Sequence, residues 1–128
     1  MKFAKNVFTI AGIWGLLVTI PPFFLEAKTG IDYPPAITHP EYYYGFLGTV
    51  LAWQILFFII ARDPVRLRSA MVAAILEKAA FAIAVPILYM QGRVGGTMLR
   101  FSFVDFVFGI LFIISLLKTP HRQYTHEV

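Results

Sequence analysis

Long apolar runs separated by short polar segments dominate the chain. Four of these runs are long enough for a helix that crosses a bilayer, which needs about 20 predominantly apolar residues, and they cover residues 7–25, 43–61, 70–90 and 101–117. None of them shows the period-two alternation of a half-buried strand. Because backbone polar groups inside a bilayer must be satisfied within each segment, helices are favoured. The pattern predicts an all-α fold, a single domain over residues 1–128 built as a bundle of four transmembrane helices.

Prolines and charges mark the expected helix ends. We expect Pro21-Pro22 to end or kink the first helix and Pro86 to kink the third. Asp63-Pro64 is typical of a helix N-cap followed by proline in the first helical position, which predicts that the third helix could begin at Pro64. The first apolar run is longer than the core of a signal peptide and lacks a small-x-small cleavage site. We therefore expect it to be an uncleaved first span.

The distribution of lysine and arginine predicts the orientation, since cytoplasmic loops carry an excess of both. The longest loop, residues 26–42, and the Tyr42-Tyr43-Tyr44 run then lie at the outer face, where an aromatic belt is expected. Both termini are expected in the cytoplasm. One side of the bundle carries Lys2, Lys5, Arg62, Arg66, Arg68, Lys118 and Arg122, and the other carries Lys28, Arg93 and Arg100.

Composition supports a membrane class. Hydrophobic residues make up 59% of the chain and charged residues only 14%, whereas soluble domains have about 25% charged residues. The net charge of +4 does not indicate nucleic-acid binding, because the basic residues lie at the ends of apolar runs and form no surface stripe. The chain has no cysteine, which excludes disulfides, thiol catalysis and thiolate metal sites.

Glu77 is the clearest polar residue inside a predicted span. Ionisable groups within a membrane are expensive and often functional, and Glu77 shares a helix face with Ala73, Ala80 and Ala84. Gln54 on the second span lies at a similar depth. Two readings stay open: a structural Glu77–Gln54 hydrogen bond, or a Glu77 that handles a proton or holds a polar ligand group. Lys78 is expected to extend back to the cytoplasmic interface rather than pair with Glu77.

Asp105 is a second intramembrane carboxylate, about one turn inside the fourth span. It is expected to point inwards and to find its partner on another helix, with Arg93, Arg100 or a tyrosine hydroxyl as candidates. The alternative is a His39/Glu41/Asp105 site at the outer mouth of the bundle. One imidazole and two carboxylates without a recognised ligand spacing do not predict a metal site.

Small residues predict two close helix contacts. Gly12, Gly15 and Thr19 form one ridge, and residues 45, 48 and 52 form another on the second span. Because Gln54 lies nearly opposite the second ridge, both faces of that span call for protein contact, and homodimerisation is a hypothesis. The 13 phenylalanines could line a pocket for an apolar or aromatic ligand, or simply pack helices and face lipid.

Several segments together resemble the BphX-like family of small bacterial membrane proteins. They are the run Asp32–Phe46 with its His-Pro-Glu-Tyr stretch, Leu51-Ala-Trp-Gln54, Ala61-Arg-Asp-Pro-Val65 and Leu76-Glu-Lys78. The resemblance implies the inner membrane of a bacterium and carries no functional residue over to this chain. The four-helix plan is also similar, more distantly, to the DoxX-like proteins and the sterol isomerases, an analogy at the level of fold.

Three functions remain open from the sequence. The leading hypothesis is a non-enzymatic protein that binds a small hydrophobic or aromatic molecule or assists a membrane complex. The second is a membrane enzyme or redox accessory with Glu77 or Asp105 as acid or base, and the third is a transport component. Whether the protein uses a cofactor is left open by the sequence. The candidate ligand-binding residues are Glu77, Gln54, Asp105, Trp53, His39 and Glu41.

Overall fold

Helices make up the ordered architecture of the computed structural model, which describes residues 2–121. They are α1 (Lys2–Thr19), the 3₁₀ turn η1 (Pro21–Phe24), α2 (Glu26–Asp32), α3 (Pro40–Arg62), α4 (Ala70–Met90) and α5 (Gly96–Lys118). No strand occurs within the described range. The segments Lys2–Phe24, Pro40–Arg62, Ala70–Met90 and Gly96–Lys118 are each long and apolar enough to cross a membrane. The predicted all-α chain with four such helices is confirmed.

One of the two helix ends predicted from proline is confirmed and the other is not. Pro21 and Pro22 lack amide donors, and α1 ends just before them, at Thr19. The helix predicted to begin at Pro64 instead begins at Ala70, so that prediction was wrong. Asp63 Oδ1 does accept a hydrogen bond from the Arg66 amide at 3.2 Å, but the segment it caps consists only of turns. Pro86 lies inside α4, which continues beyond it to Met90.

The first long connection is partly helical rather than a plain loop. Within α2, Lys28 forms an exposed ion pair with Asp32 at 2.6 Å, and this hydrogen-bonded partner raises the pKa of the Lys28 ammonium. The Tyr43 hydroxyl donates to the Pro22 carbonyl at 2.6 Å and lies 3.2 Å from the Thr29 hydroxyl. These bonds attach η1 and α2 to the start of α3.

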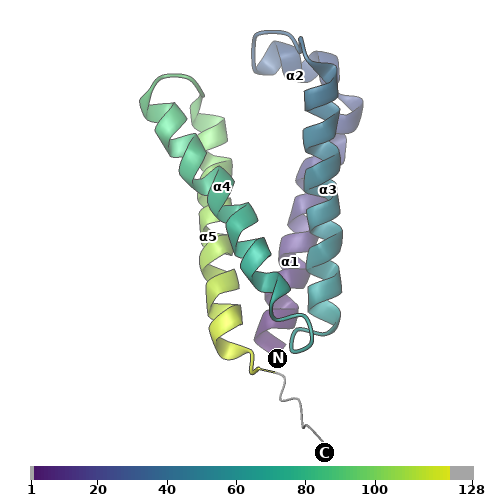
Figure 1. Cartoon of the computed structure of the whole chain (residues 1–128). Helices are drawn as coiled ribbons and strands as arrows, with labels where there is room; N and C mark the ends of the chain where they lie inside the picture. Colours follow the sequence, from purple (N-terminus) through teal and green to yellow (C-terminus); the bar gives the residue numbers. More distant parts are fainter. Residues whose placement is uncertain (1, 122–128) are drawn as a thin grey trace, which may run out of the picture.

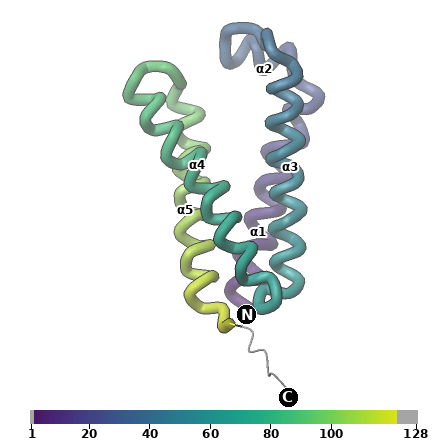
Figure 2. The backbone as a smooth tube through the Cα atoms, in the orientation of Figure 1, coloured from purple at the N-terminus to yellow at the C-terminus, as the bar shows by residue number. Residues whose placement is uncertain are grey.

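The four long helices form two antiparallel pairs. Helix α1 packs along α3, and α4 packs along α5, while α1 also contacts α5 and α3 touches α4 only slightly. The pairs meet at the end that holds the N-terminus and the turn of residues 63–69, and they diverge towards the opposite end (Figure 1). The backbone trace has the outline of a V, with α3 and α4 on its two arms (Figure 2).

The buried core lies towards the end where the pairs meet. Phe8 stacks on Phe112 with ring centroids 4.3 Å apart, and Phe57 packs edge-on against Phe112 at 5.1 Å, so one aromatic cluster joins α1, α3 and α5. By contrast, many large apolar side chains on every long helix are exposed, among them Leu17, Leu76 and Phe103. Apolar surface on this scale requires an apolar surrounding or a protein partner.

Of the two predicted small-residue ridges, one is covered by a neighbouring helix and the other is not. On α1, Gly12, Gly15 and Thr19 are buried, and side chains of α3 occupy the space beside the two glycines, as a close contact requires. On α3, Gly45 and Gly48 have open space where a β carbon would be. The first ridge is thus the α1–α3 contact, and the second is uncovered.

The α1–α3 contact predicts a cost for a methyl group at Gly15. A β carbon there would overlap the side chain of Gln54, whereas Gly48→Ala meets nothing. Relative to Gly48→Ala, which controls for helix propensity, Gly15→Ala should lower the free energy of unfolding by roughly 1–3 kcal/mol, as overpacking does. Denaturation of the purified protein in detergent measures this difference. In the Gln54→Ala background the cost of Gly15→Ala should shrink markedly, and an unchanged cost would show that Gln54 is not the obstacle.

Candidate functional site

Lys78 is the centre of a buried charge cluster. Its side chain is 4% exposed, and its Nζ lies 3.3 Å from Asp105 Oδ1 and 3.6 Å from Glu77 Oε2. The prediction that Lys78 extends to the interface and does not pair with Glu77 was therefore wrong. Lys78 shares a face of α4 with the buried Ala74 and Val85, and that face packs on α5. The ammonium is thus enclosed and paired inside the bundle.

Helix α5 provides both the space and the counter-charge for this lysine. Gly109 faces the Lys78 stem, since a β carbon on it would lie only 3.5 Å from Lys78 Cβ. One turn earlier, Asp105 accepts a hydrogen bond from Lys78 Nζ. The prediction that the partner of Asp105 comes from another helix is confirmed, but the partner is Lys78 and not Arg93, Arg100 or a tyrosine. Those candidates failed because α5 turns Asp105 towards α4.

Two aromatic rings complete the surroundings of the ammonium. Lys78 Nζ lies 5.3 Å from the centroid of the Phe57 ring on α3 and 5.8 Å from that of Phe108 on α5. At separations up to about 6 Å the negative face of an aromatic ring attracts a cation. The cluster therefore connects three helices. Helix α3 contributes the Phe57 ring, and α4 and α5 contribute the charged side chains.

Gln54 belongs to a different contact. Its side chain is 1% exposed, its Nε2 donates to the Val50 carbonyl at 2.9 Å, and its Oε1 has no hydrogen-bond partner among the described residues. It packs against Gly15 of α1. The predicted Glu77–Gln54 hydrogen bond is absent from the described contacts because this face of α3 is turned to α1. Similar depth in two spans did not bring the two side chains together.

The outer-mouth site of His39, Glu41 and Asp105 does not form. His39 Nδ1 lies 3.2 Å from Glu41 Oε1, and both side chains are exposed, while Asp105 is held by Lys78. Within residues 2–121 there is no group of three or more histidine, cysteine, aspartate or glutamate side chains that could hold a metal ion. His39 and Glu41, which are close in sequence, therefore contact each other, whereas Asp105 lies elsewhere and completes no site with them.

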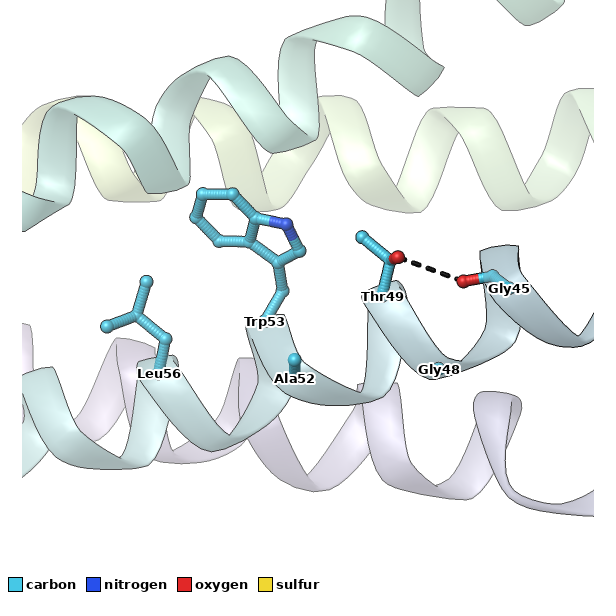
Figure 3. A pocket seen from close by; sticks show the side chains of 6 residues that line it. All are labelled: Gly45, Gly48, Thr49, Ala52, Trp53 and Leu56. Carbon is cyan, nitrogen blue, oxygen red and sulfur yellow. Dashed lines mark hydrogen bonds between the residues drawn. The ribbon is translucent and has the colours of Figure 1, made fainter.

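An open groove of about 520 Å³ runs along α3. Gly45, Gly48 and Ala52 leave it shallow and smooth, and the Trp53 indole stands away from the helix beside them (Figure 3). Thr49 also lines it, and its hydroxyl donates to the Gly45 carbonyl at 2.9 Å. Neither Glu77 nor Asp105 is a lining residue. The sequence singled out Trp53 and the small-residue ridge separately but did not predict that they form one surface, which Leu56 completes.

Removal of the Lys78 ammonium should be costly, because it leaves Glu77 and Asp105 without their shared counter-charge. Breaking a buried pair by deleting one partner costs roughly 3–5 kcal/mol, so Lys78→Met should lower the free energy of unfolding by about that much. The triple variant Lys78→Met/Glu77→Gln/Asp105→Asn should recover most of the loss. Lys28→Met, which removes an exposed ion pair, is the matched control and should have little effect. If Lys78→Met is as stable as this control in detergent denaturation, the cluster has no structural role.

Comparison of the chain with protein-family models, with curated proteins and with solved structures gave no match in any of the three.

Proposed function

We propose that the chain is a multi-pass protein of a bacterial inner membrane, with four spanning helices and both termini in the cytoplasm. The exposed apolar side chains on all four long helices suit a lipid surrounding. The turn of residues 63–69 carries Arg66 and Arg68 at the same end of the bundle as the N-terminus (Figure 1). Arg68 Nε donates to the Thr119 carbonyl at 2.8 Å, so the end of α5 lies there too. A basic end of this kind is typical of a cytoplasmic face, and the BphX-like resemblance favours a bacterial address.

Single cysteines test the orientation, because the wild-type chain contains none and serves as the blank. Ser69 lies in the basic turn and Gln91 just after α4, and both are exposed. A membrane-impermeant maleimide should label Gln91→Cys in intact cells with a permeabilised outer envelope, and Ser69→Cys only after lysis. The reverse pattern would invert the topology, and labelling of both before lysis would exclude a spanning α4.

The proposed activity is non-enzymatic binding of a small hydrophobic or aromatic molecule in the α3 groove. The observation that carries it is the exposed small-residue floor of Gly45, Gly48 and Ala52 beside the Trp53 indole. The volume of about 520 Å³ falls within the range of roughly 300–1,000 Å³ typical of small-molecule sites. Small residues allow a flat ring to approach the helix, and an indole offers a face for offset stacking.

The polar groups of the groove restrict the ligand further. Among the lining residues, the side chains that can hydrogen-bond are those of Thr49 and Trp53. The Thr49 hydroxyl already donates to a backbone carbonyl, which leaves it as an acceptor, while the indole N–H is a donor only. The fitting ligand is therefore largely apolar with one carbonyl or hydroxyl oxygen, and it carries no full charge.

The geometry favours this binding function over acid–base catalysis. A general acid or base must reach the reacting atom within hydrogen-bond distance or through one water. Glu77 and Asp105 both lie within 4 Å of Lys78 Nζ, and neither lines the groove. A substrate seated on Trp53 would thus find no carboxylate among the residues that line its site.

Native mass spectrometry of the purified protein tests the groove. Wild type should retain a small apolar adduct. Ala52→Phe, which fills the groove, should lose it. Ile59→Phe is the matched control, since Ile59 is an exposed residue of the same helix outside the groove, and it should keep the adduct. Absence of any adduct from wild type, or its retention by Ala52→Phe, would overturn the proposal. A wild-type dimer that Ala52→Phe converts to a monomer would instead assign this face to a second copy of the chain.

A further inference from the structure

The charge cluster around Lys78 does not balance when every group is ionised. Two carboxylates, Glu77 and Asp105, face one ammonium, which leaves a formal charge of −1. An uncompensated charge inside an apolar bundle is strongly unfavourable, and buried groups usually change their protonation state instead. A further positive charge must therefore come from another residue or from a proton.

No residue of the long helices provides that second positive charge. Helix α4 has no charged residues other than Glu77 and Lys78. On α5, Arg100 is exposed and lies five residues before Asp105, which turns it to about the opposite side of the helix at 100° per residue. The remaining charged residues of the long helices all lie at or near helix ends: Lys2, Lys5, Glu41, Arg62 and Lys118.

A second observation identifies the carboxyl that lacks a partner. Glu77 Oε2 is buried and has no hydrogen-bond partner among the described residues. Its distance to Lys78 Nζ, 3.6 Å, is longer than the 3.3 Å from Nζ to Asp105 Oδ1. An ionised oxygen in that position would be buried without a hydrogen bond, which is costly. The ammonium–carboxylate pair is therefore Lys78 with Asp105.

We infer that the cluster is a proton-binding site, in which Glu77 holds one exchangeable proton beside the Lys78–Asp105 ion pair. On release, the O–H bond of the Glu77 carboxylic acid breaks, its electron pair stays on the carboxylate, and one proton leaves. The side chains of Glu77 and Asp105 are 14% and 18% exposed, so neither carboxyl is fully enclosed, whereas the Lys78 side chain is only 4% exposed. Glu77 lies about 10 Å along α4 from its first residue at 1.5 Å per residue, which is well inside the span.

The inference does not depend on the groove, since none of the three residues lines it. It gives the chain a chemistry that a simple apolar binder lacks, the uptake and release of one proton within a membrane-crossing segment. Aspartate and glutamate side chains within membrane-crossing segments are recurrent carriers in proton relays.

Infrared spectroscopy of the ligand-free protein in lipid vesicles tests the site through the C=O stretching band of a protonated carboxylic acid. At neutral pH, wild type should show one such band, shifted in D₂O. Glu77→Gln should abolish it, because the Lys78–Asp105 pair is then neutral. Asp105→Asn should abolish it as well, because Glu77 then ionises to pair with Lys78. Both variants are electroneutral at the cluster and are therefore expected to fold.

Two further samples complete the test. Glu41→Gln removes an exposed carboxylate and should leave the band unchanged, while Lys78→Met, if it folds, should roughly double the band because both carboxyls become protonated. A wild-type protein without the band at neutral pH, or a band that survives Glu77→Gln, would overturn the inference. These outcomes are separate from the adduct measurement, since no ligand is involved.

Discussion

The packing of the helices depends on how the Lys78 ammonium is accommodated inside an apolar bundle. A buried ammonium must keep a counter-charge within about 4 Å, because the interior offers no water to replace it. Asp105 meets this requirement from α5 at 3.3 Å, and Gly109 on the same helix leaves room for the lysine stem. The tight α4–α5 pair follows from this arrangement. Phe57 on α3 then places a ring near the same cation, which links the α4–α5 pair to the other half of the molecule.

The α1–α3 pair rests on a different principle, close backbone approach. Gly12 and Gly15 have no side chains, and Phe58 and Gln54 of α3 occupy that space. Since lipid is as apolar as a leucine side chain, such packing contacts are a main source of helix association in a bilayer. The uncovered Gly45 and Gly48 have the same capacity for close approach, and none of the helices described for residues 2–121 comes within 4 Å of their β positions. Helix α3 therefore packs against the glycines of α1 on one side, and on another side its own glycines remain uncovered.

How far the sequence anticipated the structure depended on whether the signal was local. Hydropathy placed all four long helices because each apolar run is a property of consecutive residues. The starts differed by several residues where terminal turns are polar, as at Pro40 and Gly96. The site was less predictable. Glu77 and Asp105 were recognised as costly intramembrane carboxylates, but the lysine that pairs with both was expected to extend to the interface.

That error has a physical cause. The direction of a lysine side chain depends on which face of its helix is covered, and coverage is decided by the neighbouring helix rather than by the local sequence. The same holds for Gln54, whose partner was expected on α4 although its side chain packs against Gly15 of α1. The α3 groove was not predicted as one surface either, because it depends on which face of α3 the other helices leave uncovered.

The separation of the pairs also gives the protein a different cross-section at its two ends (Figure 2). Where the pairs meet, the aromatic core holds them in a narrow column. At the other end the V occupies a larger area (Figure 2). The molecule is therefore wedge-shaped, and any surrounding that covers its exposed apolar side chains must cover a broader outline where the arms part than where they meet.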